Sequence, residues 1–258
     1  MKNKKPLISI IMNCYNGEKY LKKSINSVIN QSYKNWELIF WDNHSQDNSK
    51  KILLSFKDKR IKYFKSKKLL NLYNARNLAI TKSIGTYICF LDTDDWWMKK
   101  KLQTQVNFIN NNKKVNFIYS NLYIYNEIKK TKKIYINYSI PNGKITQILL
   151  NKYRVGMGTV MISRKCFKNK KFNNNFNIIG DFDFFVSLSI KENFFYIEEP
   201  LTYYRIHVEN YSKKLKIYTA ELKKWLDTNS LKMSKLNLSL SRIKIQYFKL
   251  KIKSLVNF

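Results

Sequence analysis

The sequence is poor in several residue types, and each shortage narrows the classes of protein to which it could belong. Its 258 residues include three cysteines, Cys14, Cys89 and Cys166, whose odd number and wide spacing give neither a disulfide framework nor a cysteine metal site. We therefore expect a reducing, cytoplasmic setting. No apolar run approaches the roughly 18 residues that a membrane span needs, and the apolar stretch at residues 7–12 is too short for a signal peptide.

Acidic residues are also scarce: 17 Asp and Glu stand against 49 Lys and Arg, which gives a net charge of +32. Such a charge first suggests nucleic acid or an anionic membrane as a partner. Only six of the basic residues are arginines, however, and base-edge recognition favours the bidentate arginine fork. We therefore expect no nucleic-acid partner. Lysines that simply cover solvated surfaces and lysines that attract an anionic membrane both remain open.

The few aspartates are clustered. Seven of the nine lie within residues 42–47, 92–95 and 181–183. Carboxylates this close repel one another, so a basic protein that retains such clusters is expected to use them.

Short apolar runs alternate with helical periodicity over the first 120 residues. This pattern predicts right-handed βαβ units and an α/β fold with a mostly parallel central sheet flanked by helices. Ligands of such sheets bind beyond the carboxyl ends of the strands, where Asp42 and Asp92–Asp95 lie. The expected strands are residues 7–12, 36–41, 61–64, 86–91 and 115–120, and the expected helices begin at residue 18 and cover 49–56, 74–83 and 99–110.

The pattern changes after residue 120, and residues 121–212 are predicted to complete the cleft opposite residues 1–120. We expect an irregular segment at 124–139, a short helix at 144–150, a strand at 158–163, a helix at 180–190, and two strands, 194–197 and 201–206, around Pro200.

The last segment, residues 213–258, is predicted to form one or two helices with twelve basic and two acidic residues. Its apolar positions, which include Leu222 and Trp225, form an amphipathic stripe that favours packing on the preceding domain. A lysine-rich amphipathic helix also suits an anionic membrane surface. The sequence leaves both roles open.

Three carboxylates crowd the end of the expected fourth strand, in Phe90-Leu-Asp92-Thr-Asp94-Asp95. A divalent cation would offset their repulsion, and their oxygens suit Mg2+ or Mn2+, which often also bind substrate phosphates. An aspartate just before a helix also serves as its N-cap, and we assign Asp95 largely to that role.

Five segments carry a family resemblance in their order and spacing. They are Leu7-Ile-Ser-Ile-Ile-Met-Asn-Cys-Tyr-Asn-Gly-Glu18, Ser27-Val-Ile-Asn-Gln31, Trp36-Glu-Leu-Ile-Phe-Trp-Asp-Asn-His-Ser-Gln-Asp47, Asn74-Ala-Arg-Asn-Leu-Ala79 and Gly85-Thr-Tyr-Ile-Cys-Phe-Leu-Asp-Thr-Asp-Asp95. Together they resemble the inverting GT-A glycosyltransferases of family 2 over residues 6–120. The likeness continues more weakly through Gly180-Asp181-Phe-Asp183 and Tyr203-Tyr-Arg-Ile-His207, and does not cover the tail.

The resemblance implies a GT-A domain at residues 1–212, with a nucleotide-binding half at 1–120 and an acceptor half at 121–212, followed by the basic helical tail. It implies a nucleotide-sugar donor, Mn2+ or Mg2+, and inverting transfer to a hydroxyl of a glycan or lipid-linked glycan. Such an enzyme would work in the cytoplasm, either free or peripherally on the inner face of the cell membrane.

The resemblance also implies roles for individual residues. Many members have a second aspartate, which recognises uracil, where this chain has Asn43, so the base stays open. Asp92 and Asp94 match the metal-binding D-x-D pair, and His207 lies near a position that touches metal or phosphate in some relatives. The donor-binding positions match Asn13, Tyr15, Asp42, Asn43, Arg76 and Asp92.

Asp181 matches the position of the general base, which would take the proton of the acceptor hydroxyl. Its alternative is a helix N-cap. Asp183, two residues on, is expected to orient the acceptor or cap the helix.

Two other functions compete with this reading. A basic protein that binds nucleic acid or a membrane would explain the charge but leave the carboxylate clusters unexplained. A nucleotidyltransferase of the same fold would be expected to carry a glycine-rich phosphate loop after the first strand, which Met12-Asn-Cys-Tyr-Asn-Gly17 lacks.

Overall fold

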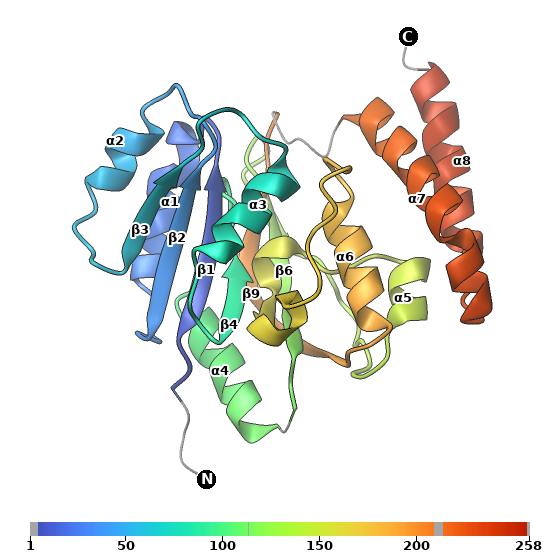
Figure 1. Ribbon diagram of the computed structural model, residues 1–258, viewed down its shortest axis with the longest axis horizontal. Coiled ribbons are helices and arrows are strands. Elements are labelled where there is room, and N and C mark those ends of the chain that lie inside the picture. Colours follow the sequence, from blue (N-terminus) through green and yellow to red (C-terminus); the bar gives the residue numbers. More distant parts are fainter. Residues whose placement is uncertain (1–4, 113, 209–213, 257–258) are drawn as a thin grey trace.

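A computed structural model describes residues 5–112, 114–208 and 214–256. Within them, a nine-stranded sheet has the order β3-β2-β1-β4-β8-β6-β9-β5, with β7 paired to β6. Helices lie on both sides of this sheet, and the last two helices stand together at one end of the molecule (Figure 1).

The first half of the sheet is parallel, as the alternating pattern predicts. Its strands pair in the order β3-β2-β1-β4. These strands are β1 (Ile8–Cys14), β2 (Trp36–Asp42), β3 (Ile61–Lys65) and β4 (Tyr87–Phe90). The helices of this half are α1 (Glu18–Ile29), α2 (Ser49–Leu54), α3 (Leu72–Thr81) and α4 (Lys101–Asn111).

Side chains of β1 alternate between two apolar cores. Ile8, Ile10 and Met12 pack in one core with side chains of α1 and α4, whereas Ile11 packs in the other with side chains of α3 and α6 (Gly180–Ser189). Successive strand residues point to opposite faces, so one strand serves both cores. Helices cover both faces of these strands. A ligand therefore reaches their polar side chains at the ends of the strands.

The second half of the sheet is mixed. β8 (Met161–Ser163) runs antiparallel between β4 and β6 (Phe117–Asn126), and β6 pairs in parallel with β9 (Phe194–Ile206). β7 (Thr131–Ile134) forms a hairpin with the end of β6. The prediction of an irregular segment at 124–139 is therefore wrong for these residues.

The structure differs from the expected strands in two further respects. The strands expected on either side of Pro200 form one continuous strand, β9. Its ladder with β6 changes register where Asn121 pairs with Pro200, because proline lacks the N–H that a regular ladder needs. A two-residue strand, β5 (Trp96–Trp97), pairs with β9 and is too short for any periodicity to reveal.

The tail packs on the preceding domain, which is the first of its two expected roles. It forms α7 (Leu215–Lys235) and α8 (Ser241–Val256), and its expected start at Lys213 lies outside the described residues. Leu222, Trp225 and Ile243 belong to the same apolar core as the side chains of α6. The Trp225 indole donates a hydrogen bond of 2.9 Å to Asp183, so Asp183 joins α6 to the tail.

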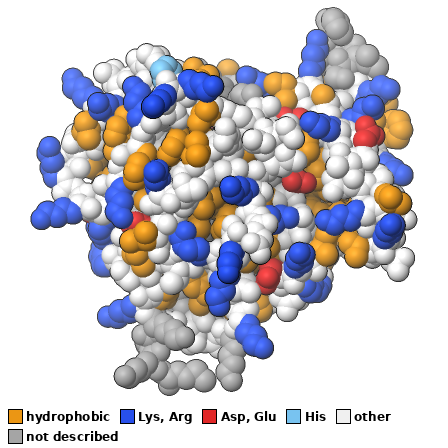
Figure 2. Space-filling view, viewed as in Figure 1, with side chains coloured by type: hydrophobic (Ala, Val, Ile, Leu, Met, Phe, Trp, Pro, Cys, Tyr) orange, Lys and Arg blue, Asp and Glu red, His pale blue; other side chains and the backbone are white. Residues whose placement is uncertain are grey.

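None of the described helices combines the length and the hydropathy that a bilayer span requires. Lysine and arginine side chains are scattered over the whole face in Figure 2, and acidic side chains on it are few.

Candidate active site

A cleft with a volume of about 970 Å³ opens beyond the carboxyl ends of β1 and β4. It brings together side chains from both halves of the chain. Of the predicted donor-binding, metal-binding and catalytic residues, those that line the cleft are Asn13, Tyr15, Asn43, Arg76, Asp92, Asp94 and Asp181. His207 lies against Asp94, whereas Asp42 is buried and is not part of the cleft wall.

The two aspartates of the D-x-D motif each have a basic neighbour. Asp92 accepts a 2.9 Å hydrogen bond from the buried guanidinium of Arg76. Oδ2 of Asp94 lies 2.9 Å from Nε2 of His207. Burial raises the pKa of Asp94, and the nearby charge of Asp92 raises it further. The hydroxyl of Ser24 on α1 fixes the loop by donating to the carbonyls of Thr93 and Asp95.

The D-x-D residues fit a cation that is shared with a substrate. Within the described residues, no group of three or more His, Cys, Asp and Glu side chains is placed to hold a metal ion without a substrate. Magnesium and manganese commonly use one or two carboxylates and complete their coordination with water and substrate phosphates. A cation at Asp94 would also relieve the repulsion that raises the pKa of this carboxyl.

The prediction that Asp95 caps the following helix is wrong. α4 begins at Lys101, with Lys100 at the N-cap. Asp95 is instead buried, and its carboxylate accepts a 2.8 Å hydrogen bond from the backbone N–H of Arg205 on β9. It ties the D-x-D loop to the second half of the sheet.

Asn13 and Tyr15 lie where a ligand would meet them. Both polar atoms of the Asn13 amide are buried and have no hydrogen-bond partner among the described residues, although Asn13 lines the cleft. A buried amide without partners is unfavourable, so a bound ligand that satisfies it gains affinity. Tyr15 is 50% exposed at the cleft, so its ring is accessible to a ligand there.

Asp42 and Asn43 hold the chain around the cleft. The Asp42 carboxylate accepts from the backbone N–H of Ser45 at 2.7 Å and from the Tyr63 hydroxyl at 2.8 Å. The Asn43 amide donates to the Leu70 carbonyl at 2.8 Å and accepts from the Leu70 N–H at 3.1 Å. Both side chains are therefore engaged in fixing loops, and a direct contact of either with the donor stays a prediction.

Asp181 lies in the first turn of α6, with one oxygen toward each of two tyrosines. It accepts from the hydroxyl of Tyr73 at 3.2 Å and from that of Tyr153 at 3.1 Å. The N-cap of α6 is Ile179, so Asp181 is not the cap. Burial raises the pKa of Asp181, and the positive charge of Arg76 and the two tyrosine hydroxyls act in the opposite direction. The arrangement gives a carboxylate of increased basicity at the edge of the cleft.

Gly180 permits the contact between Tyr73 and Asp181. A Cβ atom at this position would lie 2.4 Å from Cε2 of the Tyr73 ring, which is closer than any real carbon contact. A side chain at position 180 would therefore clash with Tyr73, and the sequence alone does not show this reason for the glycine.

The sequence model of glycosyl transferase family 2 matches residues 9–170. The chain belongs to this family. Both the family resemblance and the expected α/β GT-A fold are therefore confirmed, and the protein is a member of a glycosyltransferase family.

Named relatives and solved structures agree with this assignment. WfgD of Escherichia coli, a UDP-Glc:alpha-D-GlcNAc-diphosphoundecaprenol beta-1,3-glucosyltransferase, is 37% identical over 158 residues, or 61% of this chain and 60% of WfgD. TarS of S. aureus in complex with UDP-GlcNAc superposes with a TM-score of 0.67 at 15% identity, covering 85% of this chain and 66% of that one.

A further match is the mannosyltransferase PcManGT of Pyrobaculum calidifontis in complex with GDP-Man and Mn2+. It superposes with a TM-score of 0.64 at 12% identity, and the match covers 86% of this chain and 64% of the PcManGT chain. The glycosyltransferase chain spans about 60% of the length of WfgD. At identities this low, the solved structures show the fold.

Glu221 on α7 supports the candidate active site and was not predicted from the sequence. This buried carboxylate accepts hydrogen bonds from the backbone N–H groups of Asn177 at 2.5 Å, Ile178 at 2.9 Å and Ile179 at 3.1 Å. These residues immediately precede α6 and Asp181. The only available signal was that Glu221 is one of two acids in a tail of twelve basic residues.

Replacing Glu221 by glutamine should lower kcat about tenfold, since three charge-assisted bonds become neutral ones of roughly half the strength. Donor binding should stay unchanged, because Glu221 is not part of the cleft wall. Steady-state kinetics measures kcat, and thermal unfolding with and without the donor measures Tm and donor binding. Asp227→Asn, at an exposed position of the same helix, serves as the control. Equal kcat and Tm in Glu221→Gln and in the native protein would contradict the positioning role.

Replacing Tyr153 by phenylalanine should move the acid limb of the kcat/KM profile of the glycosyltransferase to higher pH. The lost hydroxyl donates to the ionised carboxyl, so its removal raises the pKa of Asp181 further. The profile is measured from about pH 5 to 9, a range chosen around neutral pH. Tyr138→Phe, at a half-exposed tyrosine outside the cleft, is the control. A limb that stays in place in Tyr153→Phe would mean that Asp181 does not set it.

Proposed function

We propose that this glycosyltransferase moves a sugar from a nucleotide-sugar donor to a hydroxyl of a glycan or lipid-linked glycan. The transfer inverts the anomeric carbon and uses Mn2+ or Mg2+. One observation carries the proposal: a single cleft has the Asp92–Asp94 pair from the nucleotide half and the basic carboxylate of Asp181 from the acceptor half.

The protein's own groups divide the reaction between them. Asp181 takes the proton of the acceptor hydroxyl while its oxygen attacks the anomeric carbon. The new C–O bond forms as the bond from that carbon to the diphosphate oxygen breaks, and the electron pair leaves with the nucleoside diphosphate. Attack from the face opposite the leaving group inverts the configuration.

The nucleotide half binds the donor. Asn13 offers its unpaired amide and Tyr15 its exposed ring to the base, while Arg76 orients Asp92 and brings positive charge to the phosphates. Asp94 and Asp92 would hold the cation, with His207 fixing the Asp94 carboxylate. A bound cation neutralises the charge that develops on the departing diphosphate.

Thermal unfolding with a panel of donors tests the proposal. UDP-glucose, UDP-N-acetylglucosamine and GDP-mannose are each added with and without Mn2+. A ligand at 100 times its Kd stabilises the fold by about 2.7 kcal/mol, which raises the Tm of a chain of this size by roughly 5–10 °C. We expect one donor to do so only with Mn2+, and a chelator to abolish the shift. No shift with any sugar nucleotide would overturn the proposal.

We further infer that the acceptor is lipid-linked and that α8 rests on the inner face of an anionic membrane. WfgD acts on a diphosphoundecaprenol acceptor. On α8, Ile245, Phe248 and Ile252 are 47%, 59% and 62% exposed and recur at helical spacing. Exposed lysines flank this apolar stripe, and α8 carries no acidic residue. An apolar stripe edged by lysines is complementary to anionic headgroups.

Replacing Ile245, Phe248 and Ile252 together by glutamine should reduce binding to phosphatidylglycerol vesicles at least about tenfold, since three exposed apolar side chains lose their insertion into the bilayer. Vesicle sedimentation measures the change, and Ile84→Gln, another exposed apolar position outside the tail, is the control. Native protein should bind phosphatidylcholine vesicles weakly. Equal binding of the triple variant and the native protein would contradict this placement of α8.

A further inference from the structure

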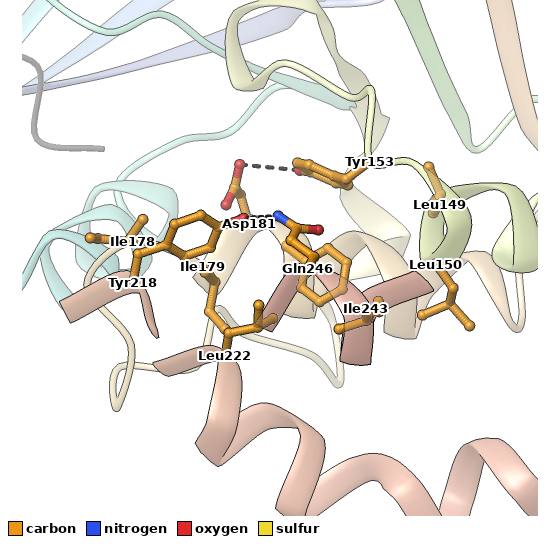
Figure 3. A pocket seen from close by; sticks show the side chains of 11 residues that line it. Leu149, Leu150, Tyr153, Ile178, Ile179, Asp181, Tyr218, Leu222, Ile243 and Gln246 are labelled. Atoms are coloured by element: carbon orange, nitrogen blue, oxygen red, sulfur yellow. Dashed lines mark hydrogen bonds between the residues drawn. The ribbon is translucent and has the colours of Figure 1, made fainter. Parts of the chain in front are cut away.

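A second cavity, with a volume of about 220 Å³, lies between α5 (Thr146–Asn151), α6 and the two tail helices. Figure 3 shows Leu149, Leu150, Leu222 and Ile243 around it, with Asp181 at its edge. Ile178 and Asp181 line both this cavity and the large cleft. The cavity therefore adjoins the proposed general base on the side of the tail.

The wall of this cavity suits an uncharged, apolar group. None of the residues that line it is basic, and Asp181 is the only acidic one among the described lining residues. The polar groups of the wall already have partners: the Tyr153 hydroxyl donates to Asp181, and the Gln246 amide donates to the Tyr218 hydroxyl at 2.7 Å. A charged ligand would lose its hydration here without compensation.

The size of the cavity sets the size of its ligand. A cavity of about 150 Å³ lined by leucine, isoleucine and phenylalanine stays dry and binds benzene. A cavity of about 220 Å³ accordingly has room for an aromatic ring or a short branched alkyl segment.

We propose that this cavity, formed by α5, α6, α7 and α8, binds the apolar aglycone of the acceptor while the acceptor hydroxyl meets Asp181. The proposal rests on the proposed function, because it takes Asp181 as the base. It adds a specificity site: the tail selects acceptors by a short apolar segment of their lipid, whereas a linking diphosphate would stay outside this wall, which has no basic residue. Such binding is equal in ground and transition states, so it lowers KM and leaves kcat unchanged.

The first experiment compares acceptors. Methyl, butyl and hexyl β-N-acetylglucosaminides and β-glucosides are offered to the full chain with its donor. KM should fall by up to about fourfold for each CH2 group that becomes buried, at constant kcat. A KM that is independent of alkyl length would overturn the proposal.

The second experiment fills the cavity. Ile243→Phe adds volume to its wall and should raise KM for the hexyl glycoside about tenfold, while KM for the methyl glycoside and the Kd of the donor stay unchanged. Leu231→Phe, at an apolar position of α7 that is 70% exposed and outside the cavity wall, is the matched control. If both glycosides respond equally to Ile243→Phe, the cavity is only a gap in the packing and the proposal is wrong.

A binding measurement separates failure of this proposal from failure of the proposed function. Hexyl glycoside alone, without donor, should raise the Tm of the native protein and leave that of Ile243→Phe unchanged. This result would support the cavity even if no acceptor in the panel were glycosylated. An absent shift in the native protein would overturn the proposal whether or not sugar transfer is observed.

Discussion

Asp181→Asn is expected to lose sugar transfer by about 10²–10⁴-fold and, at the same time, to gain thermal stability. The loss follows from removing the proposed general base, because general-base catalysis typically contributes a factor of this size. The gain in stability follows from burial, which raises the pKa of Asp181. At neutral pH, folding therefore transfers an ionised carboxylate from water into a buried environment, which is unfavourable. Donor binding should persist, because the D-x-D pair is intact.

The sign of the stability change is fixed by proton linkage. Between the ordinary pKa of an aspartate and its raised value in the fold, the folded protein binds more protons than the unfolded chain, so stability falls as pH rises. Asparagine removes this pH dependence. Kinetics and thermal unfolding of Asp181→Asn decide the matter, with Asp227→Asn as a surface control. A lower Tm with retained transfer would show that Asp181 is a structural residue of the first helical turn.

Asp94→Ala is expected to reduce transfer by about 10³-fold, since the charge on the leaving diphosphate loses a stabilisation of several kcal/mol. The Mn2+-dependent part of donor binding should disappear as well. The fold should survive, because the substitution removes a carboxyl whose pKa is raised by burial and by Asp92. Thermal shift with the donor, with and without Mn2+, measures the effect on binding.

Two controls accompany this variant. Asp227→Ala removes an exposed carboxylate of the tail and should leave transfer unchanged. His207→Ala, which frees the Asp94 carboxylate from its neighbour, should weaken the Mn2+ effect less than Asp94→Ala does. Full turnover of Asp94→Ala in the presence of a chelator would end the metal hypothesis.

The parallel half of the sheet could be predicted because its order is set locally. Each strand from β1 to β3 is followed by a helix that leads to the next strand, and right-handed crossovers leave few alternatives. The second half depends on pairing between distant strands. The continuity of β9 across Pro200 and the two residues of β5 are fixed by partners far away in sequence, which periodicity cannot report.

The candidate active site shows the same contrast between residues that could be predicted from local sequence and residues that depend on distant partners. Asn13 lies in β1, Asp92 follows β4 and Arg76 lies on α3, each within a recognisable motif, and the structure brings them together in one cleft. Tyr73 and Tyr153 reach Asp181 from 108 and 28 residues away and belong to no motif. The misassigned Asp95 illustrates the same limit, because its partner Arg205 is 110 residues away.

The contacts of α7 bear on how this protein can be recombined with its relatives. Through Glu221, and through Trp225 with Asp183, the tail holds both sides of the segment that carries Asp181. A chimera cut at residue 212 would join a foreign tail to a native loop and separate these pairs. The exchangeable unit therefore runs from the Asn177–Ile179 loop to the end of the described chain, and acceptor specificity should move with that whole block.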